Sequence, residues 1–101
     1  MDELVGALDS KLFRALIDPT RVQILKYLLL QGRADISTIA EHLPQDRSVI
    51  SRHLNLMAEA GLLVAEKQTR HRFYRLNCEI FLRQFETIAE NIRGCMKECC
   101  L

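Results

Sequence analysis

Three of the four cysteines in this chain lie within its last seven residues, and a thiol cluster of this kind can bind a metal or change its redox state. They are Cys95, Cys99 and Cys100. Thiolates are soft ligands that select thiophilic metals and metalloids. A zinc site usually needs four ligands, and none of the histidines is near these cysteines in sequence. Three thiolates alone suit a three-coordinate, pyramidal metalloid, so the cluster predicts a site for As(III) or Sb(III).

The residues alone leave other uses of the cluster open. Two of the thiols can form a disulfide in a redox or persulfide switch, the cluster can bind Zn(II) or Cd(II), or it can have no role. In an unbroken helix Cys95 and Cys99 would share a face, and Cys100 would point about 100° away. Gly94 is expected to end the last helix. We therefore predict that residues 94–101 form a flexible tail whose sulfurs gather around the ligand.

The fourth cysteine, Cys78, is expected in the first turn of the last helix. A small buried hydrophobic side chain is the simpler interpretation. Cys78 is about 25 Å from Cys95 if both lie on one helix, so it cannot join the cluster of its own chain. In an antiparallel pairing of two such helices, Cys78 of one subunit would approach the partner's cluster and supply a fourth ligand.

The composition predicts one cytoplasmic domain spanning residues 1–101. About half of the residues are apolar, which is enough for a single compact core. No apolar run is long enough to cross a membrane, and the acidic start lacks the features of a signal peptide. Cytosolic thiols are kept reduced, which favours a metal or redox role over a structural disulfide. Residues 45–75 hold six Lys or Arg and three Asp or Glu, a weak electrostatic indication of nucleic-acid binding.

Hydrophobic periodicity and capping residues predict four helices in the first part of the chain. Asp18 followed by Pro19 is typical of a helix start, Asp35 can cap another helix, and Gly32 and Gly61 are typical helix ends. The expected helices cover residues 4–17, 19–31, 36–43 and 46–60. A short helix followed by a longer one across a tight turn is the spacing of a helix-turn-helix.

The second part of the chain predicts a β-hairpin and a final helix. Residues 62–68 and 72–77 are rich in strand-forming residues and flank a polar turn. Residues 78–93 carry apolar side chains at helical spacing, namely Phe81, Phe85, Ile88 and Ile92. The expected order is ααααββα, so the fold class is mainly α with a small β-hairpin, arranged as a winged helix-turn-helix.

The chain resembles the ArsR/SmtB family of winged-helix repressors over essentially its whole length, and three segments carry the resemblance. They are LFRALIDPTRVQIL (12–25), IAEHLPQDRSVISRHLNLMAEAGLL (39–63) and RFYRL (72–76). The resemblance implies a homodimer that binds operator DNA and releases it when an inducer binds. One departure concerns the wing, which often has a glycine at its tip in this family, whereas no glycine lies between Val64 and Leu76 here.

The fourth helix and the hairpin carry the candidate DNA-binding residues. The helix places apolar residues on one side and a polar stripe on the other, and a stripe of this kind fits the major groove, with Arg suited to guanine and Asn to adenine. A solvated surface helix would show a similar stripe, but the preceding turn and the basic hairpin favour DNA. His53 is expected to contact a phosphate or to pack between helix and wing. The candidates are Arg47, Ser48, Ser51, Arg52, His53, Asn55, Lys67, Arg70, His71 and Arg72.

Two inducer sites used elsewhere in the family are absent from this sequence. The segment RADISTIAEHL (33–43) has no cysteine, and residues 78–93 have no histidine. The cysteine cluster resembles the site of some arsenical repressors in the family, so we expect the chain to release DNA on binding As(III) or Sb(III). The resemblance also implies dimerisation through the first and last helices, which predicts an inverted-repeat operator.

Two other classes of function compete with a DNA-binding repressor. A thiol oxidoreductase or metalloid reductase is disfavoured, because the sequence has no CxxC motif, phosphate-binding loop or catalytic constellation with a base. The second class is a winged-helix module used for protein contacts rather than DNA. Strongly salt-dependent binding of the chain to its own promoter fragment would distinguish DNA binding from that use. The chain is therefore expected to be a DNA-binding protein and not an enzyme.

Overall fold

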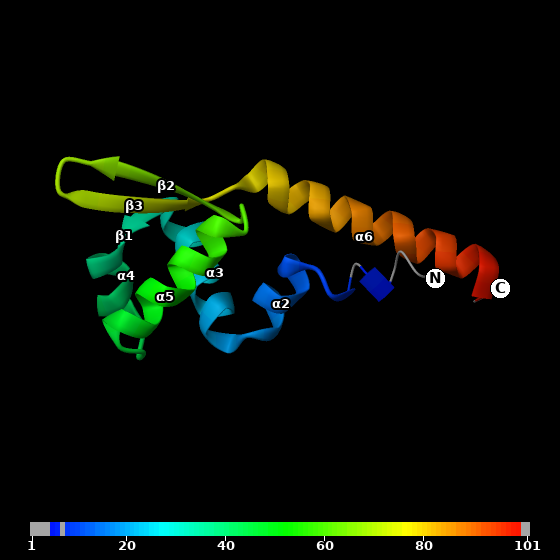
Figure 1. The fold of residues 1–101 in the computed structure, drawn as a ribbon, viewed down its shortest axis with the longest axis horizontal. Helices are drawn as coiled ribbons and strands as arrows, with labels where there is room; N and C mark the ends of the chain where they lie inside the picture. The colour runs from blue at the N-terminus through cyan, green and yellow to red at the C-terminus, as the bar shows by residue number, and fades with distance from the viewer. Residues whose placement is uncertain (1–4, 7, 100–101) are drawn as a thin grey trace.

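The computed structural model describes residues 5, 6 and 8–99. Figure 1 shows a small helical body, a β-hairpin that extends from one end of it, and a long helix that extends from the other. The elements are α2 (Lys11–Ile17), α3 (Pro19–Gln31), β1 (Arg33–Asp35), α4 (Ile36–His42), α5 (Arg47–Glu59), β2 (Leu63–Gln68), β3 (His71–Leu76) and α6 (Cys78–Cys99). This arrangement confirms the predicted winged helix-turn-helix.

Side-chain caps define where the helices begin. The Asp18 carboxylate accepts hydrogen bonds from the backbone N–H groups of Thr20 (2.9 Å) and Arg21 (3.3 Å), directly before Pro19. Asp35 caps α4 in the same way, accepting from the Thr38 N–H at 2.9 Å. Such caps satisfy N–H groups that have no partner within the helix. They explain why these starts were predictable from sequence.

The sheet has one strand more than the sequence predicted. Strand β3 lies in the middle and pairs with both β1 and β2 in antiparallel fashion, with Tyr74 opposite Ala34 on one side and Ala65 on the other. Strands β2 and β3 form the wing, in which Gln68 and His71 are paired across a two-residue turn. At this turn Thr69 takes a positive φ of 53°, the conformation for which a glycine is usually selected.

Two adjoining clusters of buried side chains form the core. The larger one packs α3, α4 and α5 against the sheet and includes Ile24, Ile39, Ile50, Leu54 and Tyr74, all fully buried. The smaller one contains Leu12, Ala15, Leu62 and Ile88, so it joins α2 and α6 to the segment that follows α5. The core therefore fixes the recognition half of the molecule and the base of α6.

Two predicted helix boundaries were wrong. The expected helix over residues 4–17 is interrupted at Asp9 and Ser10, because the Ser10 hydroxyl caps a new helix by accepting from the Phe13 N–H at 3.4 Å. Gly94 does not end the last helix, which continues to Cys99. A glycine in a helix interior costs only about 1 kcal/mol relative to alanine, and the flanking turns of α6 compensate for it.

Candidate functional site

Helices α4 and α5 form the helix-turn-helix, and α3 holds the turn between them. The Gln45 amide, in this turn, donates to the Thr20 hydroxyl (3.2 Å) and to the Gln23 side-chain oxygen (2.9 Å). On α5, the side chains of Ile50, Leu54 and Met57 are buried against the core. The opposite side of α5 is consequently the side that faces outward.

The outward side of α5 carries the predicted polar stripe. Four of its members are exposed and Ser51 is half-buried. The exposed members are Arg47, Ser48, Arg52 and Asn55. The buried Tyr74 of β3 donates its hydroxyl to the Asn55 side-chain oxygen at 3.4 Å, which links the stripe to the wing. The structure therefore brings the predicted residues of this helix together on one surface.

His53 lies on a different side of α5 from this stripe. Its ring is half-buried, and its Nδ1 accepts a hydrogen bond from the Arg21 Nε at 3.2 Å. Arg21 is in the first turn of α3, so His53 packs towards α3 and not between helix and wing. Sequence reasoning missed Arg21, although its position directly after the Asp18-Pro19 cap marks it as part of a fixed helix start. A DNA contact from His53 remains a prediction.

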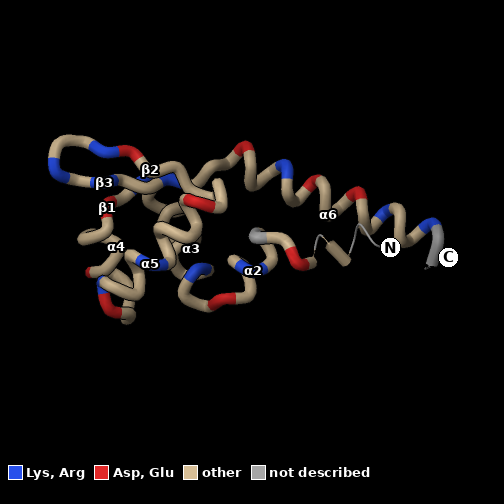
Figure 2. The backbone as a smooth tube through the Cα atoms, in the orientation of Figure 1, with Lys and Arg blue, Asp and Glu red and all other residues tan. Residues whose placement is uncertain are grey.

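The wing presents an exposed basic surface next to α5. Figure 2 shows Lys and Arg residues gathered at the far end of the hairpin. The four predicted wing residues, Lys67, Arg70, His71 and Arg72, are all exposed. The Arg72 guanidinium also lies 5.6 Å from the centroid of the Tyr74 ring, within range of a cation–π contact.

A hydrogen-bonded pair attaches the wing to the start of α4. The His71 Nδ1 lies 3.2 Å from the Asp35 Oδ2, and the other carboxylate oxygen caps α4. Hydrogen bonds from the Thr38 hydroxyl and backbone N–H, together with the nearby His71 ring, hold the pKa of Asp35 below its usual value. Asp35 therefore connects β1, α4 and the wing through one ionised side chain.

The end of α6 that carries Cys95 lies far from this surface (Figure 1), and Cys95 itself is half-buried. Cys99 is the last residue of α6, and Cys100 lies outside the described residues. Cys78 is exposed at the other end of the same helix. Over the described ranges, no three His, Cys, Asp or Glu side chains are grouped to hold a metal ion.

The exposed face of α6 is apolar along most of its length. Phe81 packs against both core clusters and its ring contacts that of Phe85, with centroids 5.0 Å apart. Beyond the core, large apolar side chains on α6 remain between 42% and 60% exposed. They are Leu82, Phe85, Ile92 and Met96. No helix in the part of the chain that the structure describes is long and apolar enough to span a membrane.

Comparisons with known proteins agree with this architecture. The family model described as "Bacterial regulatory protein, arsR family" matches residues 18–64. An uncharacterised HTH-type transcriptional regulator of Methanocaldococcus jannaschii is 37% identical over 65 residues, which cover 64% of this chain and 73% of that protein. The arsenical resistance operon repressor of Escherichia coli is 38% identical over 72% of this chain, and the match spans 62% of the repressor.

A solved structure also matches nearly the whole chain. It is an ArsR-like transcriptional regulator from Rhodococcus sp. RHA1, which is 27% identical with a TM-score of 0.78 and coverage of 98% of this chain and 88% of that one. The helix-turn-helix, the wing and these likenesses lead to the same assignment. The chain belongs to the arsR family of bacterial regulatory proteins, which are DNA-binding transcriptional regulators and not enzymes.

Proposed function

We propose that the chain is a dimeric repressor that binds an inverted-repeat operator and releases it when As(III) or Sb(III) binds Cys95, Cys99 and Cys100. The observation that carries the DNA-binding part is the outward polar stripe of α5 beside the basic wing. In this arrangement Arg52 and Asn55 contact base edges, while Lys67 and Arg70 contact phosphates. Arg47, Ser48, Ser51, His53, His71 and Arg72 complete the candidate surface.

The apolar face of α6 supports dimerisation. Leu82, Phe85 and Ile92 would expose a contiguous apolar strip to water in a monomer, and such strips mark interaction surfaces. Pairing α6 with α6 of a second copy, with α2 alongside, would cover this strip. A two-fold dimer presents two recognition helices, which explains why an inverted repeat is the expected operator.

The inducer part of the proposal depends on the thiols at the end of α6. Cys95 and Cys99 would supply two sulfurs one helical turn apart, and Cys100 would supply the third sulfur of a three-coordinate site. The likeness to the E. coli arsenical resistance repressor supports a trivalent metalloid as the signal. Because the same helix forms the proposed dimer contact, ligand binding would change how the two subunits are oriented.

An operator-release titration with a panel of candidate inducers tests this function. The protein is bound to a labelled duplex selected from a random library, and arsenite, antimonite, Zn(II), Cd(II) and hydrogen peroxide are added separately. We expect release by arsenite and antimonite at about one equivalent per subunit. Release only by Zn(II), Cd(II) or peroxide would contradict the metalloid assignment.

A Cys78→Ser variant in the same titration tests whether the partner's Cys78 is a fourth ligand. An unchanged stoichiometry and response would remove Cys78 from the site. A response to Zn(II) or Cd(II) that the wild type has and Cys78→Ser lacks would instead place Cys78 in a four-ligand metal site.

A further inference from the structure

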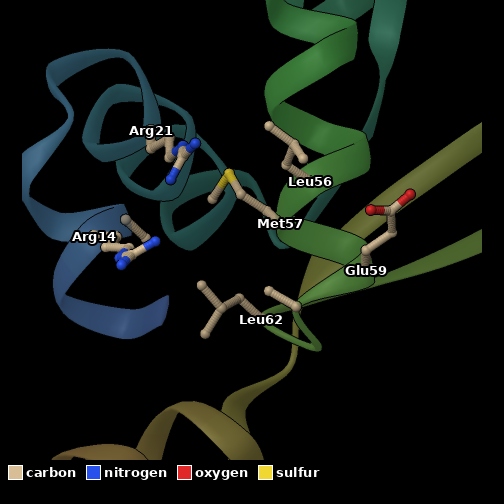
Figure 3. Close-up of a pocket in the computed structure, with 8 residues that line it drawn as sticks. Arg14, Arg21, Leu56, Met57, Glu59 and Leu62 are labelled. Carbon is tan, nitrogen blue, oxygen red and sulfur yellow. The ribbon is translucent and has the colours of Figure 1, made fainter. Parts of the chain in front are cut away.

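A pocket of about 240 Å³ lies between α2, α3 and the C-terminal half of α5, apart from both the polar stripe and the cysteines. Figure 3 shows Arg14 and Arg21 directed into it from one side and Met57 and Leu62 from the others. The walls of the pocket are formed by helices of the winged helix-turn-helix fold. None of the functions proposed above uses this pocket.

The two arginines make one end of the pocket positively charged. Arg14 is exposed and Arg21 is half-buried. In the described part of the chain, neither guanidinium forms an ion pair with a carboxylate. Glu59 also lines the pocket, but its carboxylate is directed away from both arginines in Figure 3. An anion would therefore meet two guanidinium groups that have no acidic partner among the described residues.

The other end of the pocket is apolar. Met57 and Leu62 are buried there, and Leu56 is 45% exposed. The volume is below the roughly 300–1,000 Å³ that is typical of pockets for drug-sized ligands. An occupant must therefore be small, with one negative charge and an apolar body. We propose that this pocket is a binding site for a small organic monocarboxylate, held by Arg14 and Arg21.

The pocket is also connected to the recognition helix. The Arg21 Nε donates to the His53 Nδ1 of α5 at 3.2 Å, and Leu56 and Met57 belong to the same helix. A carboxylate in the pocket competes with His53 for the Arg21 guanidinium and so weakens a contact that holds α5 against α3. Occupancy therefore lowers operator affinity. This coupling rests on the proposed function of α5 in DNA binding, whereas ligand binding itself does not.

Benzoate is a suitable probe, with benzamide as its uncharged counterpart. Binding is followed by NMR chemical-shift changes of the labelled, DNA-free protein. We expect saturable binding of benzoate with shifts at residues of the pocket, and much weaker binding of benzamide. Arg14→Glu should weaken benzoate binding about tenfold or more, because a charged hydrogen bond is lost, whereas Arg14→Lys should retain most of it.

Arg93→Glu is the matched control, because Arg93 is exposed on α6 away from the pocket. Equal binding of benzoate and benzamide, equal loss in Arg14→Glu and Arg93→Glu, or no saturable binding at all would overturn the site. These measurements need no DNA, so they can fail while the proposed repressor function holds.

The coupling is tested by fluorescence anisotropy of the labelled operator duplex. Benzoate at saturation should weaken operator binding by at least about fivefold, the lower end of typical allosteric coupling. The effect should disappear in Arg14→Glu and persist in Arg93→Glu. Unchanged operator affinity at saturating benzoate would overturn the coupling, and failure of the ligand-free protein to bind any duplex would instead contradict the proposed function.

Discussion

Arg52 and Arg70 are proposed to make two different kinds of DNA contact. Arg52 projects from the outward side of α5, where base edges of the major groove are within reach in the proposed complex. Arg70 lies at the tip of the wing, in the turn between β2 and β3, and in the proposed complex it contacts the sugar–phosphate backbone. Substitutions of the two arginines should therefore lower DNA affinity in different ways. The two losses should depend differently on the DNA sequence and on the salt concentration.

Alanine variants separate these two roles. Arg52→Ala should weaken operator binding by about 1–3 kcal/mol and reduce discrimination at one base pair. Arg70→Ala should weaken binding to all duplexes alike and make the dependence on salt less steep, because one phosphate contact is lost. Gel-shift titrations at several salt concentrations measure both effects, with Arg93→Ala as the control. Unchanged binding by both variants would contradict the assigned surface.

Asp35 shows at the element scale how one side chain can hold three elements together. It ends β1, caps α4 and contacts His71 of the wing. Its pKa is lowered from 3.8, chiefly by hydrogen bonds from Thr38, so folding favours the ionised form. The resulting stabilisation is complete above the ordinary pKa and is lost as the pH falls through the lower value of the folded state.

Asp35→Asn tests this linkage, because asparagine keeps the cap but removes the charge. At neutral pH the variant should be less stable than the wild type by about 1 kcal/mol or less. The difference should shrink as the pH falls below the ordinary pKa of about 3.8 and through the lower pKa of the folded state, where the native carboxylate becomes protonated. Urea unfolding at a series of pH values measures it. Asp46→Asn is the matched control, since the Asp46 side chain makes no capping hydrogen bond; an equal pH effect there would contradict the account.

The elements that could be predicted from sequence are those with local signals. Asp18, Asp35 and Gly61 each mark a helix boundary by a cap or a positive φ, and the structure confirms these boundaries. Strand β1 has only three residues and exists because β3 lies beside it, so no local pattern announced it. The predicted end of α6 at Gly94 is wrong. A glycine often ends a helix, but the turns on both sides of Gly94 favour continuation, and α6 extends to Cys99.

The candidate site also contains residues that a local pattern predicts and residues that only tertiary packing brings together. The polar stripe of α5 follows from helical periodicity, so its members were identifiable before the fold was known. The Arg21–His53 hydrogen bond joins residues 32 positions apart, and only tertiary packing brings them together. For the same reason, the pocket beside Arg21 and His53 could not be predicted from the sequence.

At the scale of the whole molecule, α6 separates the proposed inducer site from the proposed DNA-binding surface. The chain is elongated, with principal dimensions of 54 × 24 × 21 Å. The wing lies at one end, and α6 carries Cys95 towards the other (Figure 1). In the proposed function, a ligand at Cys95 is too far from the DNA-binding surface of its own chain to contact it. The proposed signal therefore passes through the relative orientation of the two subunits.

Charged substitutions on the apolar face of α6 test the dimer. Phe85→Glu and Ile92→Glu should each give a monomer in sedimentation, because a carboxylate would be buried in the contact. Operator affinity should fall when dimerisation is lost, since two recognition helices no longer bind together. Glu90→Gln, at an exposed position of the same helix, is the control. A dimer that survives both glutamate substitutions would place the contact elsewhere.

The central claim is that metalloid binding at the end of α6 lowers operator affinity. The most direct measurement is the anisotropy of a labelled operator duplex titrated with arsenite, for the wild type and for a variant with Cys95, Cys99 and Cys100 all replaced by serine. The account predicts equal DNA binding without arsenite, a 5- to 150-fold loss of affinity in the wild type, as expected for a coupling of about 1–3 kcal/mol, and no loss in the variant. Release from the serine variant, or stoichiometric arsenite binding by the wild type without release, would contradict it.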